Sequence, residues 1–417
     1  MDVAHSDGLL LVIGGGVRVY REYLLASLAR RRAWLLDEAP AAWQLGYLAG
    51  STAVPRIRAV RLTSNLDALA EQVDRIAAKH PVTGLLTYEE TLVVPTARLA
   101  ERLNLPGLSV LGAQNCRDKQ RSRTALTDAG LRQPAFSFVN DGMEALLAAD
   151  RIGYPVVVKP RGMGGSVGVV RADGPSTVLA AFAAADGASR YGNSAYSGGA
   201  LVEELLDGPE ISIDGAVHDG DYRPIFVARK TVGLEPFFEE RGHIVDAADP
   251  LLDDGDLQTM LQTAHTALGV RDGVTHTEVK LTGRGPAIVE VNGRLGGDLI
   301  PLLGRLATGV DPADIAADIA TGTAPRWRVR RRGSVGIRFC YPPTDGVVRG
   351  VRLPRPGNVP GLLRADRLAP DGAVLGLPPR AYLSRYALVV CEAPDPARCA
   401  GVLREAVSRV SLDLEPT

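Results

Sequence analysis

Residues 276–298 carry the pattern that most restricts the fold, because polar and apolar side chains alternate there on both sides of a glycine turn. Side chains alternate between the two faces of a β-strand. The stretch HTEVKLTGRGPAIVEVNGRLGGD therefore predicts a hairpin that turns at residues 283–285. Its polar face is predicted to carry His276, Glu278, Lys280, Ile288, Glu290, Asn292 and Arg294. Its apolar face is predicted to carry Thr277, Val279, Leu281, Val289 and Val291.

Two acidic side chains, Glu278 and Glu290, are expected to face each other across this hairpin, with their Cβ atoms about 5–8 Å apart. Facing carboxylates repel each other unless a positive charge lies between them. Mg²⁺, or Mn²⁺ in its place, meets that need because it is a hard cation that takes oxygen ligands. Asn292 adds a neutral oxygen, and Arg294 is suited to hold an anion. A sheet face with paired surface charges is the alternative interpretation.

A glycine-rich loop lies between two predicted strands in residues 154–170, YPVVVKPRGMGGSVGVV. Lys159 ends the first strand, and the loop 162–168 follows it. A phosphate-binding Walker loop would need Gly-Lys-Ser/Thr at the start of a helix, and that sequence is absent. Strand, glycine loop and strand instead indicate a lid whose backbone N–H groups close over phosphates. A plain hairpin has the same pattern.

Lysine is rare in this chain, since only five of its 47 basic residues are lysines (Lys79, Lys119, Lys159, Lys230 and Lys280). A lysine that is kept against this bias is more often one that needs a compact ammonium group.

A further pattern is the strand-like segment 201–215, LVEELLDGPEISIDG. Its exposed backbone can pair with the edge of a base, and the Glu210 carboxylate can accept hydrogen bonds from hydroxyl groups.

The first hundred residues alternate predicted strands (9–16, 33–37 and 83–90) with predicted helices (17–31 and 66–80). This alternation is typical of a parallel α/β layer. The three glycines 14–16, with Asp37 further along, fit part of the dinucleotide-binding pattern. That pattern fails at Val19, where a third glycine is required. A tight turn explains the glycines equally well, so nicotinamide binding stays an alternative.

The order of Lys119, Lys159, the glycine loop, VEELLDGPE, Lys230, HTE and VEVNGR resembles the ATP-grasp superfamily of carboxylate–amine ligases, over about residues 115–300. The resemblance implies an ATP-grasp fold of α/β and α+β class, with an N-terminal Rossmann-like parallel-sheet domain. It also implies ATP and Mg²⁺ as cofactors. In such a reaction a carboxylate attacks the γ-phosphate, giving an acyl-phosphate and ADP, and an amine then attacks the acyl carbon.

The resemblance implies a role for each matching residue. The phosphates would be contacted by Lys119, Lys159 and Lys230, and covered by the loop with Ser166 and Val167. The base would be held by Glu203, Glu204, Leu205 and Leu206, and the ribose by Glu210. The metal ligands would be Glu278, Glu290 and Asn292, and Arg294 would stabilise the acyl-phosphate, so that Arg294 and Lys230 are the expected catalytic residues.

Within the superfamily, FFEERGHIVDA, HTEVK and NGRLGGD look most like the L-amino-acid ligases that form dipeptides. This likeness implies a substrate pocket with Glu240, His243, Arg294 and Gly297. The sequence departs from the pattern at Asp246, where a proline is usual. Other readings are an ATP-grasp ligase or carboxylase of the purine or biotin type, a nicotinamide-dependent oxidoreductase, and a nucleotide sensor without turnover.

The chain length of 417 residues suggests several domains, and we expect boundaries at 1–118, 119–199, 200–325 and 326–417. The 48 acidic and 47 basic side chains nearly cancel, which gives no electrostatic argument for a nucleic-acid or membrane partner. The apolar stretches are too short for a membrane span or a secretory signal. The four cysteines include no CxxC pair. We therefore expect a cytoplasmic enzyme with small-molecule carboxylate and amine substrates. A homodimer is compatible with the sequence.

Overall fold

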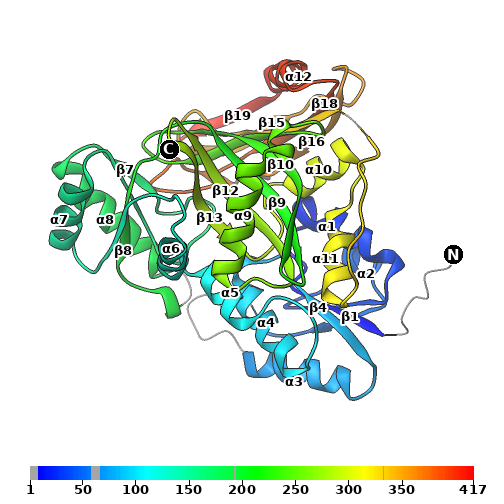
Figure 1. Ribbon diagram of the computed structural model, residues 1–417. Helices are drawn as coiled ribbons and strands as arrows, with labels where there is room; N and C mark the ends of the chain where they lie inside the picture. The colour runs from blue at the N-terminus through cyan, green and yellow to red at the C-terminus, as the bar shows by residue number, and fades with distance from the viewer. Residues whose placement is uncertain (1–7, 58–65, 192–193, 332) are drawn as a thin grey trace.

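The computed structural model describes residues 8–57, 66–191, 194–331 and 333–417, whose strands form four sheets (Figure 1). The prediction that no secretory signal is present was based in part on residues 1–7. These residues lie outside the described part of the chain. In the described residues, no helix is both long enough and apolar enough to cross a membrane.

The N-terminal domain contains the parallel sheet that the sequence predicts. Its four strands run in the order β3-β2-β1-β4, and every neighbouring pair is parallel. The strands are β1 (Leu9–Ile13), β2 (Ala33–Asp37), β3 (Gly50–Ala53) and β4 (Val82–Leu86). The helices of this part are α1 (Arg18–Ser27), α2 (Ala42–Leu45), α3 (Leu66–Ala77), α4 (Val93–Arg102) and α5 (Val110–Arg117). Loops at the carboxyl edge of such a sheet are the usual place for ligand contacts.

A small antiparallel sheet, which we call the lid, lies to the left in Figure 1. Its strand order is β5-β8-β6-β7, with β5 (Phe136–Val139), β6 (Val156–Lys159), β7 (Val170–Ala172) and β8 (Ala200–Glu204). The helices α7 (Gly142–Ile152) and α8 (Pro175–Ser189) pack against it through small apolar side chains such as Ala148 and Ala181. The glycine loop joins β6 to β7.

The largest sheet has eight strands in the order β13-β12-β9-β10-β11-β14-β18-β16. They are β9 (Glu210–His218), β10 (Asp221–Gly233), β11 (Glu239–Asp246), β12 (Gly273–Thr282), β13 (Gly285–Asn292), β14 (Ser334–Cys340), β16 (Leu362–Arg367) and β18 (Ala387–Ala393). The last three come from the segment 326–417, so this segment continues the sheet that carries the predicted metal hairpin. The boundaries of the four predicted domains stay predictions.

Helices cover both faces of this sheet. The helices α9 (Gly255–Leu268) and α6 (Lys119–Asp128) bury Leu261 and Leu126 against one face. The helices α10 (Ile300–Thr308) and α11 (Pro312–Ala320) bury Leu303 and Ile319 on the other face, in a core that also contains Val12 of β1. The N-terminal domain therefore shares its core with the large sheet. The remaining elements are α12 (Pro396–Ser408) and a three-stranded sheet of β15 (Gly346–Arg352), β17 (Val374–Leu375) and β19 (Ser411–Pro416).

Aspartate caps explain where several of these helices begin. A carboxylate before the first turn accepts hydrogen bonds from backbone N–H groups that have no partner inside the helix. Asp118 accepts from Gln120 N at 3.0 Å and so fixes the start of α6, which places Lys119 in its first turn. The same arrangement occurs before α7, α9, α11 and α12, at Asp141, Asp254, Asp311 and Asp395.

Candidate active site

A cleft with about 840 Å³ of empty space, part of it open to solvent, lies between the lid and the large sheet. Most of the predicted site residues line it: Lys119, Lys159, Ser166, Glu203, Glu204, Leu205, Leu206, Glu210, Lys230, Glu240, Glu278 and Glu290. Five predicted residues are outside this lining, namely Val167, His243, Asn292, Arg294 and Gly297. The cleft therefore combines residues that are as far apart in sequence as Lys119 and Glu290.

Lys119 contacts both the glycine loop of the lid and the hairpin of β12 and β13. Its ammonium donates to the backbone oxygen of Met163 in the glycine loop at 2.6 Å and to Glu290 Oε1 at 3.0 Å. The glycine loop itself needs unusual backbone geometry, since Gly165 and Gly168 have φ of 64° and 75°, and Ser166 has φ of 56°. This left-handed region is accessible to glycine at little cost. The two glycines therefore allow the tight turns that this loop makes.

Glu203 is the centre of a buried ion cluster. Its carboxylate accepts from Arg123 Nε at 2.8 Å and from Arg123 Nη2 at 3.1 Å, and it lies 2.7 Å from Lys159 Nζ. Burial alone raises the pKa of Glu203, but Arg123 and Lys159 outweigh it and lower the pKa to about 2. Burial lowers the pKa of Lys159, although Glu203 opposes this shift. The Glu203 carboxylate therefore holds Lys159 and Arg123, and a contact of Glu203 with the base stays a prediction.

Lys230 lies among three carboxylates. Its ammonium is 2.6 Å from Glu210 Oε1, 2.7 Å from Glu240 Oε1 and 3.2 Å from Glu278 Oε2. Burial alone lowers the pKa of Lys230, but the three carboxylates outweigh it and raise the pKa well above its ordinary value. Lys280, the other lysine of the sheet face, lies 3.4 Å from Glu210 Oε2. Lys230 is therefore positively charged at neutral pH.

The hairpin of β12 and β13 has the register that the sequence predicted at its acidic pair, because Glu278 lies directly opposite Glu290. Each of the two carboxylates has a lysine of its own, Lys230 at 3.2 Å from Glu278 and Lys119 at 3.0 Å from Glu290. Asn292 lies beside Glu290: in the orientation that satisfies its amide, the nitrogen donates to Glu290 Oε1 at 3.2 Å. The repulsion expected between two facing carboxylates is therefore offset by these neighbours.

One part of the predicted hairpin is wrong. The register shifts between Glu278 and Val279, so that Val279 pairs with Ile288 and Val289 becomes an extra residue. Ile288 is buried in the core, on the face that had been predicted for Val289, whereas Val289 lines the cleft. A β-bulge of this kind adds one extra residue to the strand, so the alternation between the two faces shifts by one residue at that point. Simple alternation therefore fails at Ile288 and Val289.

A histidine, His276, lies beside Glu278 of the acidic pair. His276 Nδ1 is 2.6 Å from Oδ1 of Asp214, a fully buried residue, and its Nε2 is 3.6 Å from Glu278 Oε1. Burial alone lowers the pKa of His276, but Asp214 and Glu278 raise it to about 9. A side chain at Gly296 would place its Cβ 2.8 Å from His276 Nδ1, so this contact requires glycine at position 296. His276 thus adds positive charge beside Glu278.

Arg294 follows β13 and contacts the N-terminal domain. Its Nε lies 2.5 Å from Oε2 of Glu90, a residue in the short 3-10 helix after β4 that sequence reasoning did not select. Arg117 Nε lies 3.4 Å from the other oxygen of Glu90. Burial alone raises the pKa of Glu90, but Arg294 and Arg117 outweigh it and lower the pKa. Glu90 therefore holds Arg294 in place from the N-terminal part of the chain.

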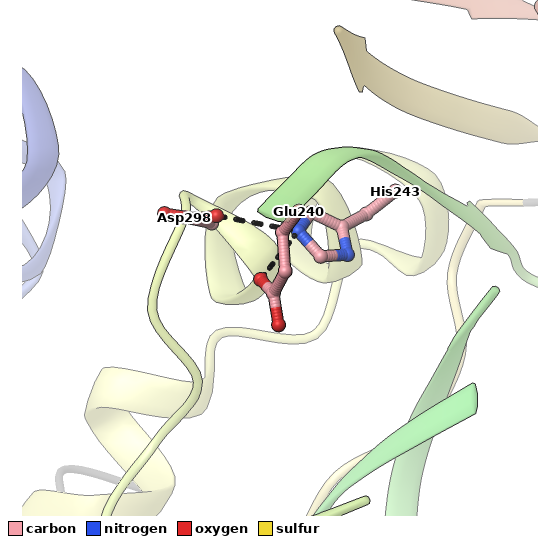
Figure 2. Close-up of side chains that lie close together, drawn as sticks. All are labelled: Glu240, His243 and Asp298. Atoms are coloured by element: carbon pink, nitrogen blue, oxygen red, sulfur yellow. Dashed lines mark hydrogen bonds and ion pairs between the residues drawn. The ribbon is translucent and has the colours of Figure 1, made fainter. Parts of the chain in front are cut away.

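Two of the predicted substrate residues, Glu240 and His243, lie together with Asp298, whereas Arg294 pairs with Glu90. Figure 2 shows that His243 points toward Glu240 and Asp298, with Nε2 at 3.3 Å from Glu240 Oε2 and 3.5 Å from Asp298 Oδ2. Burial alone lowers the pKa of His243, but hydrogen bonds to Asp298 and Glu240 outweigh it and raise the pKa. Gly297 precedes Asp298, and its carbonyl accepts from Ile300 N at 2.8 Å. Asp298 was not predicted, although it follows Gly297 directly.

The N-terminal glycine turn is held by its own domain. Asp37 is buried, and its Oδ2 accepts from Gly15 N at 2.9 Å and from Gln44 Nε2 at 3.4 Å. Its Oδ1 accepts from Glu38 N at 2.7 Å. The Asp37 carboxylate thus closes the glycine turn, which supports the tight-turn interpretation of residues 14–16.

Family models match two parts of the chain. A model described as an ATP-grasp domain matches residues 152–301, and one described as an ATP-grasp N-terminal domain matches residues 36–107. Together they account for more than half of the chain. The chain is an ATP-grasp domain protein. The predicted family and fold class are therefore confirmed. The first match includes the glycine loop, Lys230 and the hairpin of β12 and β13.

Individual proteins agree with this ATP-grasp assignment. The chain is 28% identical to an alanine–anticapsin ligase of Bacillus subtilis over 277 residues, which is 61% of this chain and 57% of that relative's length. The structure of an L-amino acid ligase from Bacillus licheniformis superposes with a TM-score of 0.79 at 21% identity, covering 98% of this chain and 99% of that one. A biotin carboxylase from Campylobacter jejuni has a TM-score of 0.70 at 16% identity, covering 98% and 92%. These two likenesses establish a shared ATP-grasp fold.

Proposed function

We propose that this ATP-grasp protein is a carboxylate–amine ligase that joins two amino acids through an acyl-phosphate and releases ADP and phosphate. The observation that carries the proposal is the convergence of Lys119, Lys159 and Lys230 with the facing carboxylates Glu278 and Glu290 around one cleft. Phosphoryl transfer depends mainly on positioning and charge neutralisation, and these groups supply both.

The nucleotide would bind between the lid and the large sheet. Its phosphates would contact Lys119, Lys159 and Lys230, under the glycine loop with Ser166 and Val167. The base would contact the backbone from Glu204 to Leu206, and the ribose Glu210. Glu203 supports this arrangement indirectly, because its carboxylate fixes the position of Lys159 at 2.7 Å.

The donor set of the hairpin fits a magnesium or manganese ion. Glu278 and Glu290 are directly opposite each other, and Asn292 lies on the same strand as Glu290. Carboxylate and amide oxygens are the ligands that Mg²⁺ uses in proteins, together with substrate phosphates. When bound there by Glu278, Glu290 and Asn292, the ion would neutralise charge on the phosphates.

Arg294 would stabilise the negative charge of the acyl-phosphate. A guanidinium can hold two oxygens of such a group at once. Glu90 of the N-terminal domain supports this role, because its Oε2 lies 2.5 Å from Arg294 Nε and fixes the position of that side chain. Closure of the glycine loop would exclude water, which would otherwise hydrolyse the acyl-phosphate.

An amino-acid substrate is supported by the charges around His243. Glu240 and Asp298 each present a carboxylate oxygen within 4.8 Å of its Nε2 and of one another. Each carboxylate already has a cationic partner, Lys230 for Glu240 and Arg385 for Asp298. A carboxylate has about four acceptor sites, so both can still accept a hydrogen bond from an ammonium group. Both amino acids stay unidentified, because sequence identity to the alanine–anticapsin ligase is 28% and covers 57% of that protein.

The direct test is to incubate the protein with ATP, Mg²⁺ and single or paired L-amino acids, and to measure ADP, AMP and phosphate. We expect amino-acid-dependent release of ADP and phosphate in equal amounts, with a dipeptide of matching mass. AMP as the stoichiometric product would exclude an acyl-phosphate. Turnover that needs bicarbonate would indicate a carboxylase, and nucleotide binding without turnover would indicate a sensor.

A further inference from the structure

The segment 326–417 contributes a buried arginine to the substrate end of the cleft. Arg385 lies just before β18, and its side chain is 5% exposed. Its guanidinium binds both oxygens of Asp298, with Nη1–Oδ1 at 2.6 Å and Nη2–Oδ2 at 2.7 Å. Its Nη2 also donates to the backbone oxygen of Glu240 at 3.0 Å. A single side chain therefore joins β11 to the loop that follows β13.

Aromatic neighbours fix the plane of this guanidinium. Its Cζ lies 3.7 Å from the centre of the Phe339 ring. Its Nε donates to the Tyr341 hydroxyl at 2.8 Å, and that hydroxyl lies 2.8 Å from Glu239 Oε2. A planar, stacked and bidentate arginine cannot be replaced by lysine without loss of geometry. The position of Asp298 thus depends on groups from β14 and from the segment before β18.

The neighbouring residues extend this contact to the lid. Leu383 N donates to Glu239 Oε1 at 3.2 Å. A Cβ added at Gly165 of the glycine loop would lie 3.1 Å from Leu383 Cδ1, so the two residues are in close contact. The backbone of Gly168 lies close to the Tyr382 hydroxyl. The segment from Tyr382 to Arg385 therefore touches both the glycine loop and the substrate loop.

We propose that Arg385 is a positioning residue for the amino-acid substrate, acting through Asp298, and that the segment 326–417 is part of the substrate site. This inference rests on the proposed function. Asp298 has φ of 50°, a conformation that residues other than glycine rarely adopt without support, and the two hydrogen bonds from Arg385 supply that support. Because Asp298 and Glu240 both contact His243, a shift of either one changes the pocket.

Arg385→Lys tests this role, since it keeps the positive charge and removes the planar fork. We expect the KM of the amino acid to rise at least tenfold, while the KM of ATP and the affinity for a non-hydrolysable ATP analogue, measured by calorimetry, stay within twofold. Tyr341→Phe should act in the same direction with a smaller effect. The control is Arg380→Lys, in the same segment, because Arg380 is 72% exposed and pairs with Asp345 at the surface.

A double variant tests whether Arg385 acts through Asp298. Asp298→Asn should raise the KM of the amino acid, and Asp298→Asn with Arg385→Lys should be little worse than either single variant. Additive losses, or a parallel loss of nucleotide affinity, would overturn the inference. So would an unchanged KM in both Arg385→Lys and Tyr341→Phe. A wild-type protein that turns over ATP with no amino acid would instead overturn the proposed function.

Discussion

The phosphate end and the substrate end of the cleft differ in how the chain assembles them. Around Glu278 and Glu290, the charged groups come from short motifs within one hairpin and from lysines that pair with them at 3.0–3.2 Å. Around His243, they come from β11, from the loop after β13 and from the segment before β18, which are joined by Arg385. Motifs of the first kind can be recognised in a sequence, whereas the contacts that Asp298 and Arg385 make with β11 exist only after folding.

The two ends also differ in the cations that pair with their carboxylates. Lysines pair with Glu278 and Glu290, whereas His243 and Arg385 pair with Asp298. Glu240 belongs to both ends, because it lies 2.7 Å from Lys230 and 3.3 Å from His243. If this comparison is correct, variants at one end change nucleotide chemistry and variants at the other change amino-acid affinity.

The largest effect is expected from Glu290→Gln, which keeps the size of the side chain and removes its charge. The turnover rate should fall on the order of a thousandfold, because charge neutralisation at the phosphates is lost. Glu278→Gln should behave alike, and the double variant should be little worse than either. The measurement is kcat for ADP release at varied Mg²⁺, with the surface variant Glu405→Gln as control. Near-normal turnover in either single variant would place the site elsewhere.

Glu203→Gln should mainly reduce stability, because it leaves Arg123 and Lys159 buried without a carboxylate. The pKa of Glu203 is about 2, against 4.5 for an ordinary glutamate, which corresponds to about 3 kcal/mol of stabilisation. A lowered carboxylate pKa stabilises the fold above pH 4.5 and loses this effect as the pH falls toward 2. Urea unfolding should therefore separate the variant from wild type at pH 7 and much less at pH 3.

The matched control for this variant is Glu204→Gln at the next residue. Glu204 pairs with Arg284, whose side chain is 68% exposed, and exposed ion pairs contribute little. We expect a change of about 0–1 kcal/mol. Equal losses in the Glu203 and Glu204 variants would contradict the buried-cluster interpretation.

Glu90→Gln tests whether the N-terminal domain takes part in catalysis. Arg294 would lose the carboxylate that holds its Nε at 2.5 Å, and a small displacement of a catalytic group can cost about a hundredfold in rate. We therefore expect kcat/KM to fall by about that factor with unchanged nucleotide affinity. Glu71→Gln, an exposed variant of the same domain, should match wild type. Equal kinetics for both would mean that Glu90 serves only in domain packing.

The smallest effect is expected from His243→Ala, which removes the imidazole between Glu240 and Asp298. The KM of the amino acid should rise about tenfold, with ATP affinity unchanged. Glu240→Gln should raise both KM values, because Glu240 also contacts Lys230. Steady-state kinetics over a panel of amino acids measures both effects. Wild-type kinetics in the two variants would remove His243 and Glu240 from the substrate pocket.

The sequence by itself determined the parallel sheet of the first domain, the hairpin with its facing glutamates, and the ATP-grasp family. The first two depend on repeats of two or about 3.6 residues, which are local patterns. The family depends on the order of several short motifs over about residues 115–300. Lys119, Lys159 and Lys230 could also be selected, because lysine is rare in this chain. The positions of Ile288 and Val289 could not, since a bulge depends on how the partner strand pairs.

Only the tertiary structure decided which cation neutralises which carboxylate. Electrostatic forces act through space, so Glu90 could pair with Arg294, and Asp298 with Arg385, across separations of 204 and 87 residues. The structure likewise joined the segment 326–417 to the large sheet through the pairing of β11 with β14. That pairing, with the pairing of β14 and β18, brings Tyr341 and Arg385 to the strand that carries Glu240 and His243. No local pattern encodes such a contact, because it forms only when the long intervening chain has folded.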